Sequence, residues 1–345
     1  MLRWFGRHVA VAAVCASTFA GAFAPARAED VASFYKGKTV NVVIAFSPGG
    51  GYDLYARVLA KFMGRHIPGN PTLVPQNMPG AGTLRAAMYL YSVAPKDGTV
   101  IGTFSRSMPL APLMALPGAN FDATKFTWLG SITKDTVVCV SWKTSPVKIW
   151  DDMFKTEYKA GGEGKGADPD VYATLIQKSF GAKVKLVTGY PGSADISLAM
   201  ERGEVDGLCG VSYSTIRSTH PNWITDKQVN LLVQGALEPD PLMPNVPFMI
   251  DLAKTEQQKE ILRLSLAPQS LARPFVAPPG VPADRAKALQ KAFDDTMKDP
   301  DFLAEAKKLG LDVNPIAGEK VRAMLTEIYA TPDDVVKQTR SVMGY

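Results

Sequence analysis

The strongest constraint on the fold is an alternation of apolar runs and amphipathic helical patterns that begins at Lys38. The run 39–46 (TVNVVIAF) is almost continuously apolar, as expected of a strand that is covered on both faces. The segment 53–64 then places apolar side chains at i, i+3, i+4 and i+7 from Tyr55, which is the stripe of a packed helix. Strand and helix patterns continue to alternate through 72–103. This order predicts an α/β protein with parallel sheets and helices on both faces.

A second block with the same alternation starts near Phe126. Strand and helix patterns follow one another up to the proline-rich segment 238–248. The last third of the chain is mostly helical, with amphipathic patterns from residue 283 onward. The sequence therefore predicts two α/β blocks and a helical tail.

The first 28 residues have the pattern of a secretory signal peptide. Arg3 and Arg7 precede the apolar region 9–23, and the residues 26–28 (Ala-Arg-Ala) fit a cleavage site. The apolar region is too short to span a bilayer as a stable anchor. We therefore expect a mature chain that begins at Glu29 and is located in the periplasm.

Composition argues against several classes of function. The formal net charge of +5 includes three arginines of the signal, and no Lys- or Arg-rich block remains without them, so nucleic-acid binding has no support. His66 and His220 both lie in turn-like surroundings, and no Cys/His spacing suits zinc. We expect neither a metal nor a cofactor.

The mature chain keeps two cysteines, Cys139 and Cys209. A disulfide is possible in an exported protein. Both residues lie in apolar, strand-like runs, however, so buried free thiols are the favoured interpretation.

A loop with three glycines joins the first strand pattern to the first helix pattern, at 47–53 (SPGGGYD). Glycines let backbone N–H groups approach an anion, and the helix that follows adds positive charge at its N-terminus. The loop lacks the Lys-Ser/Thr pair of a P-loop and the third glycine of a dinucleotide motif. Asp53, in the first helical turn, would repel a polyphosphate. The pattern therefore favours an anion smaller than a nucleotide.

Catalysis is the less favoured interpretation. The nearest match to a G-x-S-x-G nucleophile elbow, at 210–214, ends in serine instead of glycine. No nucleophile and base can be paired from their spacing.

Four segments, taken together, resemble a known family. They are 46–53 (FSPGGGYD), 77–102 (NMPGAGTLRAAMYLYSVAPKDGTVIG), 189–207 (GYPGSADISLAMERGEVDG) and 277–313 (APPGVPADRAKALQKAFDDTMKDPDFLAEAKKLGLDV). In this order they resemble the periplasmic substrate-binding proteins of the tripartite tricarboxylate transporters, the Bug family. The resemblance covers essentially the whole mature chain.

The resemblance implies a type-II periplasmic binding-protein fold, with two α/β domains and a ligand cleft between them. The chain would cross between the domains twice, so that 29–131 and 246–345 form domain 1 and 132–245 forms domain 2. Such proteins bind mostly organic acids and deliver them to a two-subunit integral membrane permease. We expect a monomer.

In domain 1 the resemblance places the ligand against two loops. One is the glycine loop, and the other follows the third strand, where serines could donate hydrogen bonds. Asp53 would either cap its helix or contact a ligand hydroxyl or amine. Arg106 would either pair with a ligand carboxylate or lie in solvent. The candidate residues are Ser47, Pro48, Gly49, Gly50, Gly51, Tyr52, Asp53, Ser105, Arg106 and Ser107.

In domain 2 the chain departs from the family pattern. Relatives often carry a serine-rich loop where this chain has Glu163, and an acid there disfavours a simple dianion unless it points away. Tyr190 and Tyr213 would either stack on the ligand or pack in the core. The candidate residues are Gly161, Gly162, Glu163, Tyr190, Gly192, Ser193, Cys209 and Tyr213.

These patterns together predict a receptor without catalytic activity that closes on a small carboxylate. Two alternatives stay open: a secreted enzyme that acts on an organic acid, and the extracytoplasmic sensor of a signalling system. The sequence does not name the ligand.

Overall fold

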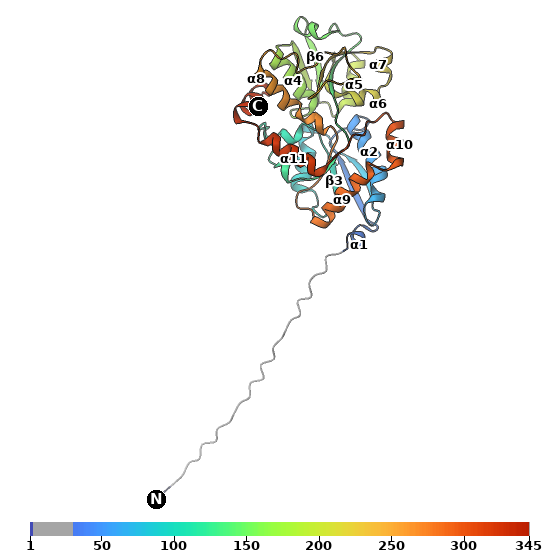
Figure 1. The fold of residues 1–345 in the computed structure, drawn as a ribbon, viewed down its shortest axis with the longest axis vertical. Coiled ribbons are helices and arrows are strands. Elements are labelled where there is room, and N and C mark those ends of the chain that lie inside the picture. The colour runs from blue at the N-terminus through green and yellow to red at the C-terminus, as the bar shows by residue number, and fades with distance from the viewer. Residues whose placement is uncertain (3–29, 345) are drawn as a thin grey trace.

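The computed structural model describes residues 1–2 and 30–344, and it divides the chain into two α/β lobes, each built on its own sheet (Figure 1). The signal peptide expected over 1–28 lies almost wholly outside the described residues. Within the described ranges, no helix combines the length and the apolar character needed to cross a membrane.

The sheet of the first lobe has the strand order β11-β4-β10-β3-β1-β2. The apolar run that opens the sequence pattern forms β1, which pairs in parallel with β2 on one side and with β3 on the other. The strands are β1 (Thr39–Ile44), β2 (Thr72–Asn77), β3 (Val100–Thr103), β4 (Thr127–Ser131), β10 (Pro274–Ala277) and β11 (Ile316–Ala317).

The sheet of the second lobe has the order β7-β6-β8-β5-β9. Its central strand β8 is buried along its whole length, as its run of small and apolar residues predicts. The strands are β5 (Val137–Trp142), β6 (Tyr158–Gly162), β7 (Val184–Thr188), β8 (Gly207–Ser212) and β9 (Val229–Gly235).

Helices cover both sheets. The predicted stripe of α2 is confirmed, because Tyr55, Val58, Leu59 and Phe62 are all buried. The segment Trp150–Phe154 of the second lobe forms a short 3-10 helix. The helices are α1 (Val31–Tyr35), α2 (Gly51–Met63), α3 (Leu84–Met88), α4 (Asp168–Phe180), α5 (Ser193–Glu201), α6 (Tyr213–Thr219), α7 (Asn222–Thr225), α8 (Glu256–Leu266), α9 (Ala283–Thr296), α10 (Pro300–Lys308), α11 (Gly318–Tyr329) and α12 (Asp333–Met343).

Neither sheet is fully parallel, so that part of the sequence prediction is wrong. β10 runs antiparallel to β3 and β4, β11 runs antiparallel to β4, and β5 runs antiparallel to β8 and β9. Of these strands, β5 and β10 each follow a crossing between the lobes, β5 after 132–136 and β10 after 267–273. A strand that starts at the boundary between lobes must run opposite to strands that end there. Its apolar pattern is the same in either direction.

The domain boundaries expected from the sequence stay a prediction, and the packing of two late helices bears on them. Ile261 and Leu262 of α8 belong to a hydrophobic cluster of the second lobe, although they follow residue 246. α12 spans both lobes, with Val336 in the cluster of the first lobe and Met343 in that of the second. In Figure 1 the C-terminus accordingly lies beside α8.

Candidate functional site

Loops at one edge of each sheet face each other where the lobes meet. In the first sheet β1 and β3 are parallel neighbours, and their carboxyl ends lead into 45–50 and 104–107. In the second sheet β6, β7 and β8 are parallel, and they lead into 163–167, 189–192 and α6. Ligands of open α/β sheets bind at this edge.

The two edges enclose a cavity of about 30 Å³. This volume has room for little more than a water molecule. The lobes are therefore closed on each other, and they must move apart to admit a larger molecule. The lining residues come from both lobes: Phe46, Gly51, Tyr52, Ser105, Arg106, Glu163, Asp168, Pro169, Ser193, Leu208, Gly210, Val211, Ser212, Thr215 and Arg273.

The N-terminus of α2 lies at this cavity. Gly51 and Tyr52, the first two residues of the helix, line it. Their N–H groups belong to the first turn, where a helix offers no internal acceptor. Neither N–H group donates a hydrogen bond to another described residue. The helix end can therefore hold an anion.

Asp53 is bonded within its own lobe. Its carboxylate accepts hydrogen bonds from the N–H of Gly49 at 3.0 Å and from Nδ2 of Asn77 at 2.8 Å, and it pairs with Arg57 at 2.9 Å. Burial favours a higher pKa for Asp53, but the hydrogen bonds from Arg57, Asn77 and Gly49 outweigh it and lower the pKa below its usual value. Asp53 is not among the residues that line the cavity.

Two of the candidate glycines lie where the lobes touch. Ser47 Oγ donates to Asp195 of the second lobe at 2.5 Å. A Cβ atom at Gly192 would lie 2.5 Å from Ser47 Oγ. A Cβ atom at Gly50 would lie 2.9 Å from Ser193 Oγ. A side chain at either position would therefore have to displace the serine hydroxyl that it meets across the boundary between the lobes.

The loop after β3 holds a carboxylate of the protein itself. Ser105 Oγ and Ser107 Oγ each donate to Oδ1 of Asp168 at 2.7 Å. Nε of Arg106 lies 2.6 Å from Oδ2 of the same residue, and Arg106 is only 2% exposed. Its NH2 group also donates to Ser212 Oγ at 2.6 Å. Asp168, at the start of α4, thus links the second lobe to the first.

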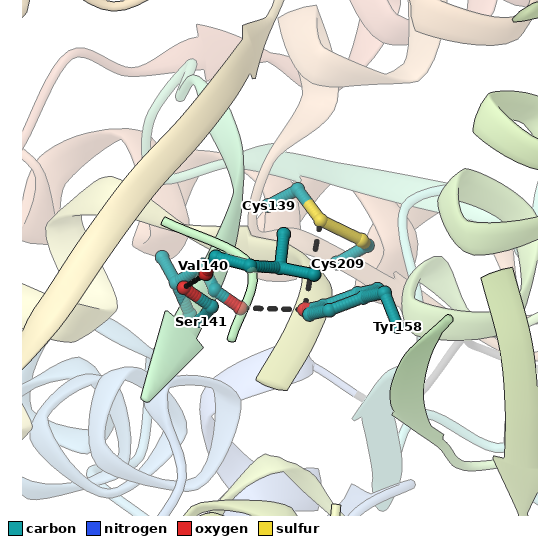
Figure 2. Close-up of a disulfide and its surroundings, with 6 residues drawn as sticks. Cys139, Val140, Ser141, Tyr158 and Cys209 are labelled. Atoms are coloured by element: carbon teal, nitrogen blue, oxygen red, sulfur yellow. Dashed lines mark hydrogen bonds between the residues drawn. A yellow bond between two sulfur atoms is a disulfide. The ribbon is translucent and has the colours of Figure 1, made fainter. Parts of the chain in front are cut away.

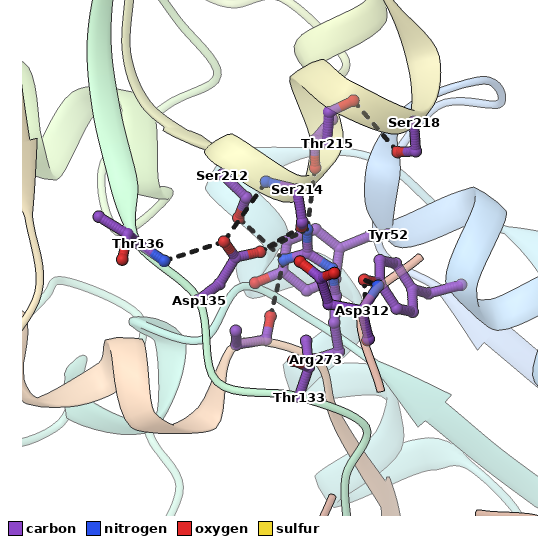
Figure 3. Close-up of polar contacts among 12 residues, drawn as sticks. Tyr52, Thr133, Asp135, Thr136, Ser212, Ser214, Thr215, Ser218, Arg273 and Asp312 are labelled. Carbon is purple, nitrogen blue, oxygen red and sulfur yellow. Dashed lines mark hydrogen bonds and ion pairs between the residues drawn. The ribbon is translucent and has the colours of Figure 1, made fainter. Parts of the chain in front are cut away.

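A second buried arginine, Arg273, lines the same cavity, and Figure 3 shows its polar contacts. It donates to Thr215 Oγ1 at 2.8 Å and to Ser212 Oγ at 3.1 Å, and it lies 3.5 Å from the carboxylate of Asp135. Its guanidinium also stacks over the ring of Tyr52, 4.7 Å from the centroid. Arg273 therefore joins the first lobe to α6 of the second.

Sequence motifs did not identify Arg273 or Asp135. Both belong to segments that cross between the lobes, 267–273 and 132–136. The sequence does contain one signal for Arg273, because it is a charged residue inside the apolar run 271–277. A buried charge needs a partner, so this pattern indicates an ion pair.

Glu163 lies in the cavity wall without a partner for its charge. It follows β6, is 9% exposed, and lines the cavity. Its backbone N–H donates to Asp170 at 2.6 Å, but its carboxyl group makes no hydrogen bond or ion pair with any described residue. Burial raises the pKa of Glu163 well above its usual range, and Asp168, Asp170 and Asp195 raise it further.

Twelve of the eighteen candidate residues predicted from the sequence do not line the cavity. Tyr213 is buried in a hydrophobic cluster of the second lobe, and Tyr190 packs against the same cluster. Six candidates do line it: Gly51, Tyr52, Ser105, Arg106, Glu163 and Ser193. The others are Ser47, Pro48, Gly49, Gly50, Asp53, Ser107, Gly161, Gly162, Tyr190, Gly192, Cys209 and Tyr213.

Cys139 and Cys209 form a disulfide, so the prediction of free thiols is wrong (Figure 2). The antiparallel pairing of β5 with β8 places the two residues directly opposite each other. Strand register is not visible in sequence spacing, which explains the error. Cys209 is fully buried and is not among the residues that line the cavity.

Neither histidine of the mature chain belongs to the site. His66 lies 2.6 Å from Asp299, and His220 stacks on Trp223 at 4.0 Å. Neither residue lines the cavity. In the part of the chain that the structure describes, no group of three or more His, Cys, Asp or Glu side chains could hold a metal ion.

Comparison with solved structures defines the class of fold. The periplasmic binding protein BugD matches with a TM-score of 0.71 at 20% identity, over 89% of this chain and 98% of that one. MatC from Rhodopseudomonas palustris, solved with bound malate, matches with a TM-score of 0.68 at 21% identity, over 87% of this chain and 99% of that one. The chain therefore has the fold of the periplasmic binding proteins, as predicted.

Sequence comparison points in the same direction. A UPF0065 protein of Cupriavidus necator is 24% identical over 318 residues, which cover 89% of each chain. No protein-family profile matches the chain. The resemblance to the Bug family that the four motifs predict is confirmed by these neighbours.

Proposed function

We propose that the protein is a periplasmic solute-binding receptor that captures a small carboxylate between its lobes. The observation that carries this proposal is the N-terminus of α2, whose unbonded amides at Gly51 and Tyr52 line a cavity between the lobes. A carboxylate there would accept these N–H groups and gain from the helix dipole. Malate bound to the structural neighbour MatC supports the same class of ligand.

The charged groups around the cavity favour binding over catalysis. Arg106 pairs with Asp168 across the boundary between the lobes, and Arg273 pairs with Asp135 between the two crossing segments, so these charges are matched by one another. Glu163 has no nucleophile bonded to it. Ser105 does donate to Asp168, but that carboxylate is paired with Arg106, and no histidine is among the lining residues. BugD, one of the structural neighbours, is a binding protein as well.

Delivery to a two-subunit membrane permease is the next step of the proposal. It follows from the family resemblance and from the signal-peptide pattern of residues 1–28. Deleting the gene should abolish uptake of the acid that the purified protein binds. Unchanged uptake, together with a lost response to that acid, would favour the sensor role.

A thermal-shift screen of organic acids on the mature protein tests the proposal. Saturating ligand stabilises a folded protein by RT ln(1 + [L]/Kd), about 2.7 kcal/mol at a hundredfold excess over Kd. We expect at least one small carboxylate to raise the melting temperature in this way. A response to sugars or metals with none to carboxylates would refute the proposed ligand class. Consumption of a bound acid by the purified protein would refute the absence of catalysis.

A further inference from the structure

The charges around the cavity leave one acidic group unmatched. Arg106 lies 2.6 Å from Asp168, and Arg273 lies 3.5 Å from Asp135, so two cations face two anions. All four side chains are at most 6% exposed. Glu163 remains, buried and without a partner among the described residues. Asp170, a buried acid nearby, accepts hydrogen bonds from the N–H groups of Glu163 and Gly164 and from Thr188, whereas the carboxyl group of Glu163 has no such partner.

Glu163 shares the cavity with the end of α2. Gly51 and Tyr52 of the first lobe and Glu163 of the second lobe line the same enclosed space. The helix end offers N–H donors and positive charge, which suit a carboxylate. Glu163 offers an acceptor, and a cation beside it favours its ionised form, so that the two groups can form an ion pair. One small molecule between the lobes can reach both features, provided that it carries both kinds of group.

We propose that the ligand carries a cationic amino group beside its carboxylate, and that Glu163 pairs with this amino group. The inference rests on the proposed function and narrows its ligand class. The carboxylate binds at the N-terminus of α2, and the amino group satisfies the buried acid as the lobes close. A dicarboxylate without an amino group adds negative charge next to Glu163 and gains no cationic contact.

Titration calorimetry with matched pairs of acids tests the proposal. The probes are propionate against β-alanine and succinate against aspartate, because each second member adds only an amino group. We expect the amino acid of at least one pair to bind at least tenfold more tightly than the plain acid. If both plain acids bind as tightly as their amino acids or more tightly, the proposed pairing with an amino group is wrong, but the proposed receptor function stands. If no carboxylate binds, here or in the thermal screen, both the pairing with an amino group and the proposed receptor function are refuted.

The variant Glu163→Gln separates a charge pair from a hydrogen bond. Glutamine keeps the shape and can donate or accept a hydrogen bond, but it carries no charge. We expect this variant to bind the amino acid about ten- to a hundredfold more weakly. The ratio of the two dissociation constants within a pair should then be close to one. A preference that survives in this variant overturns the assigned role of Glu163. Glu157→Gln is the matched control, because Glu157 is an exposed acid of the same lobe. Circular dichroism of both variants checks that they fold.

Discussion

Asp168→Asn tests whether the protein's own carboxylate holds the lobes together. Asp168 of the second lobe accepts hydrogen bonds from Ser105 and Ser107 and pairs with Arg106, all in the first lobe. In the open form these groups face water and do not need one another. The interaction therefore stabilises the closed form relative to the open form.

The expected magnitude follows from the burial of the pair. Arg106 and Asp168 are 2% and 6% exposed at their side chains. Removing one partner of a buried ion pair costs about 3–5 kcal/mol, because the other charge stays buried and unpaired. Each 1.4 kcal/mol is about a tenfold change in an equilibrium. The ratio of closed to open protein without ligand should fall by at least a hundredfold.

Small-angle X-ray scattering of the ligand-free protein measures this shift. We expect a larger radius of gyration for Asp168→Asn than for the wild type. Asp151→Asn is the control, because Asp151 is an exposed acid of the same lobe. Scattering profiles of wild type and Asp168→Asn that superpose would refute the reasoning.

Three further predictions concern stability. Replacing Cys139 and Cys209 by serine should lower the free energy of unfolding by about 4 kcal/mol, since the disulfide closes a loop of 70 residues. An unchanged urea midpoint would contradict it. Hydrogen bonds, first of all from Arg65, lower the pKa of Asp299, so its contribution is present above pH 4 and is lost as the pH falls further. The melting temperature of Asp299→Asn should therefore be lower than that of the wild type at pH 7, and this difference should shrink progressively as the pH falls below 4. Burial raises the pKa of Glu163, so ionisation destabilises the closed form as the pH rises above about 4.5. Glu163→Gln should therefore raise the melting temperature at pH 7.5, by an amount corresponding to about 1–3 kcal/mol, and leave it unchanged at pH 4; equal gains at both pH values would argue against this cause.

The fold was largely predictable because its helices and strands follow from local patterns of apolar and polar residues. The run 39–46 and the stripe that begins at Tyr55 each bury one continuous surface, and that requirement is visible in sequence. Strand direction was not predictable for β5 and β10, because it depends on where the chain crosses between the lobes. The disulfide depends on strand register in the same way.

The candidate site was predictable only in part. Loops after parallel strands meet at one edge of a sheet, so Gly51, Ser105 and Glu163 could be placed near the cleft from pattern and resemblance. The partners of the buried charges come from distant segments, as Arg273 does. The local sequence around Arg273 does not indicate which acid it pairs with.

Calorimetric titration of ligand-free mature protein with its most stabilising carboxylate, for wild type and Gly50→Val, tests the central claim most directly. The backbone at Gly50 has an ordinary extended conformation, with φ of −83°, so valine does not oppose folding there. Its Cβ atom would meet Ser193 Oγ across the boundary between lobes and obstruct closure over the ligand. We predict one site per wild-type chain and at least tenfold weaker binding by a folded variant. Wild-type affinity in Gly50→Val, or no carboxylate binding by the wild type, would contradict a receptor that closes on a small acid at this loop.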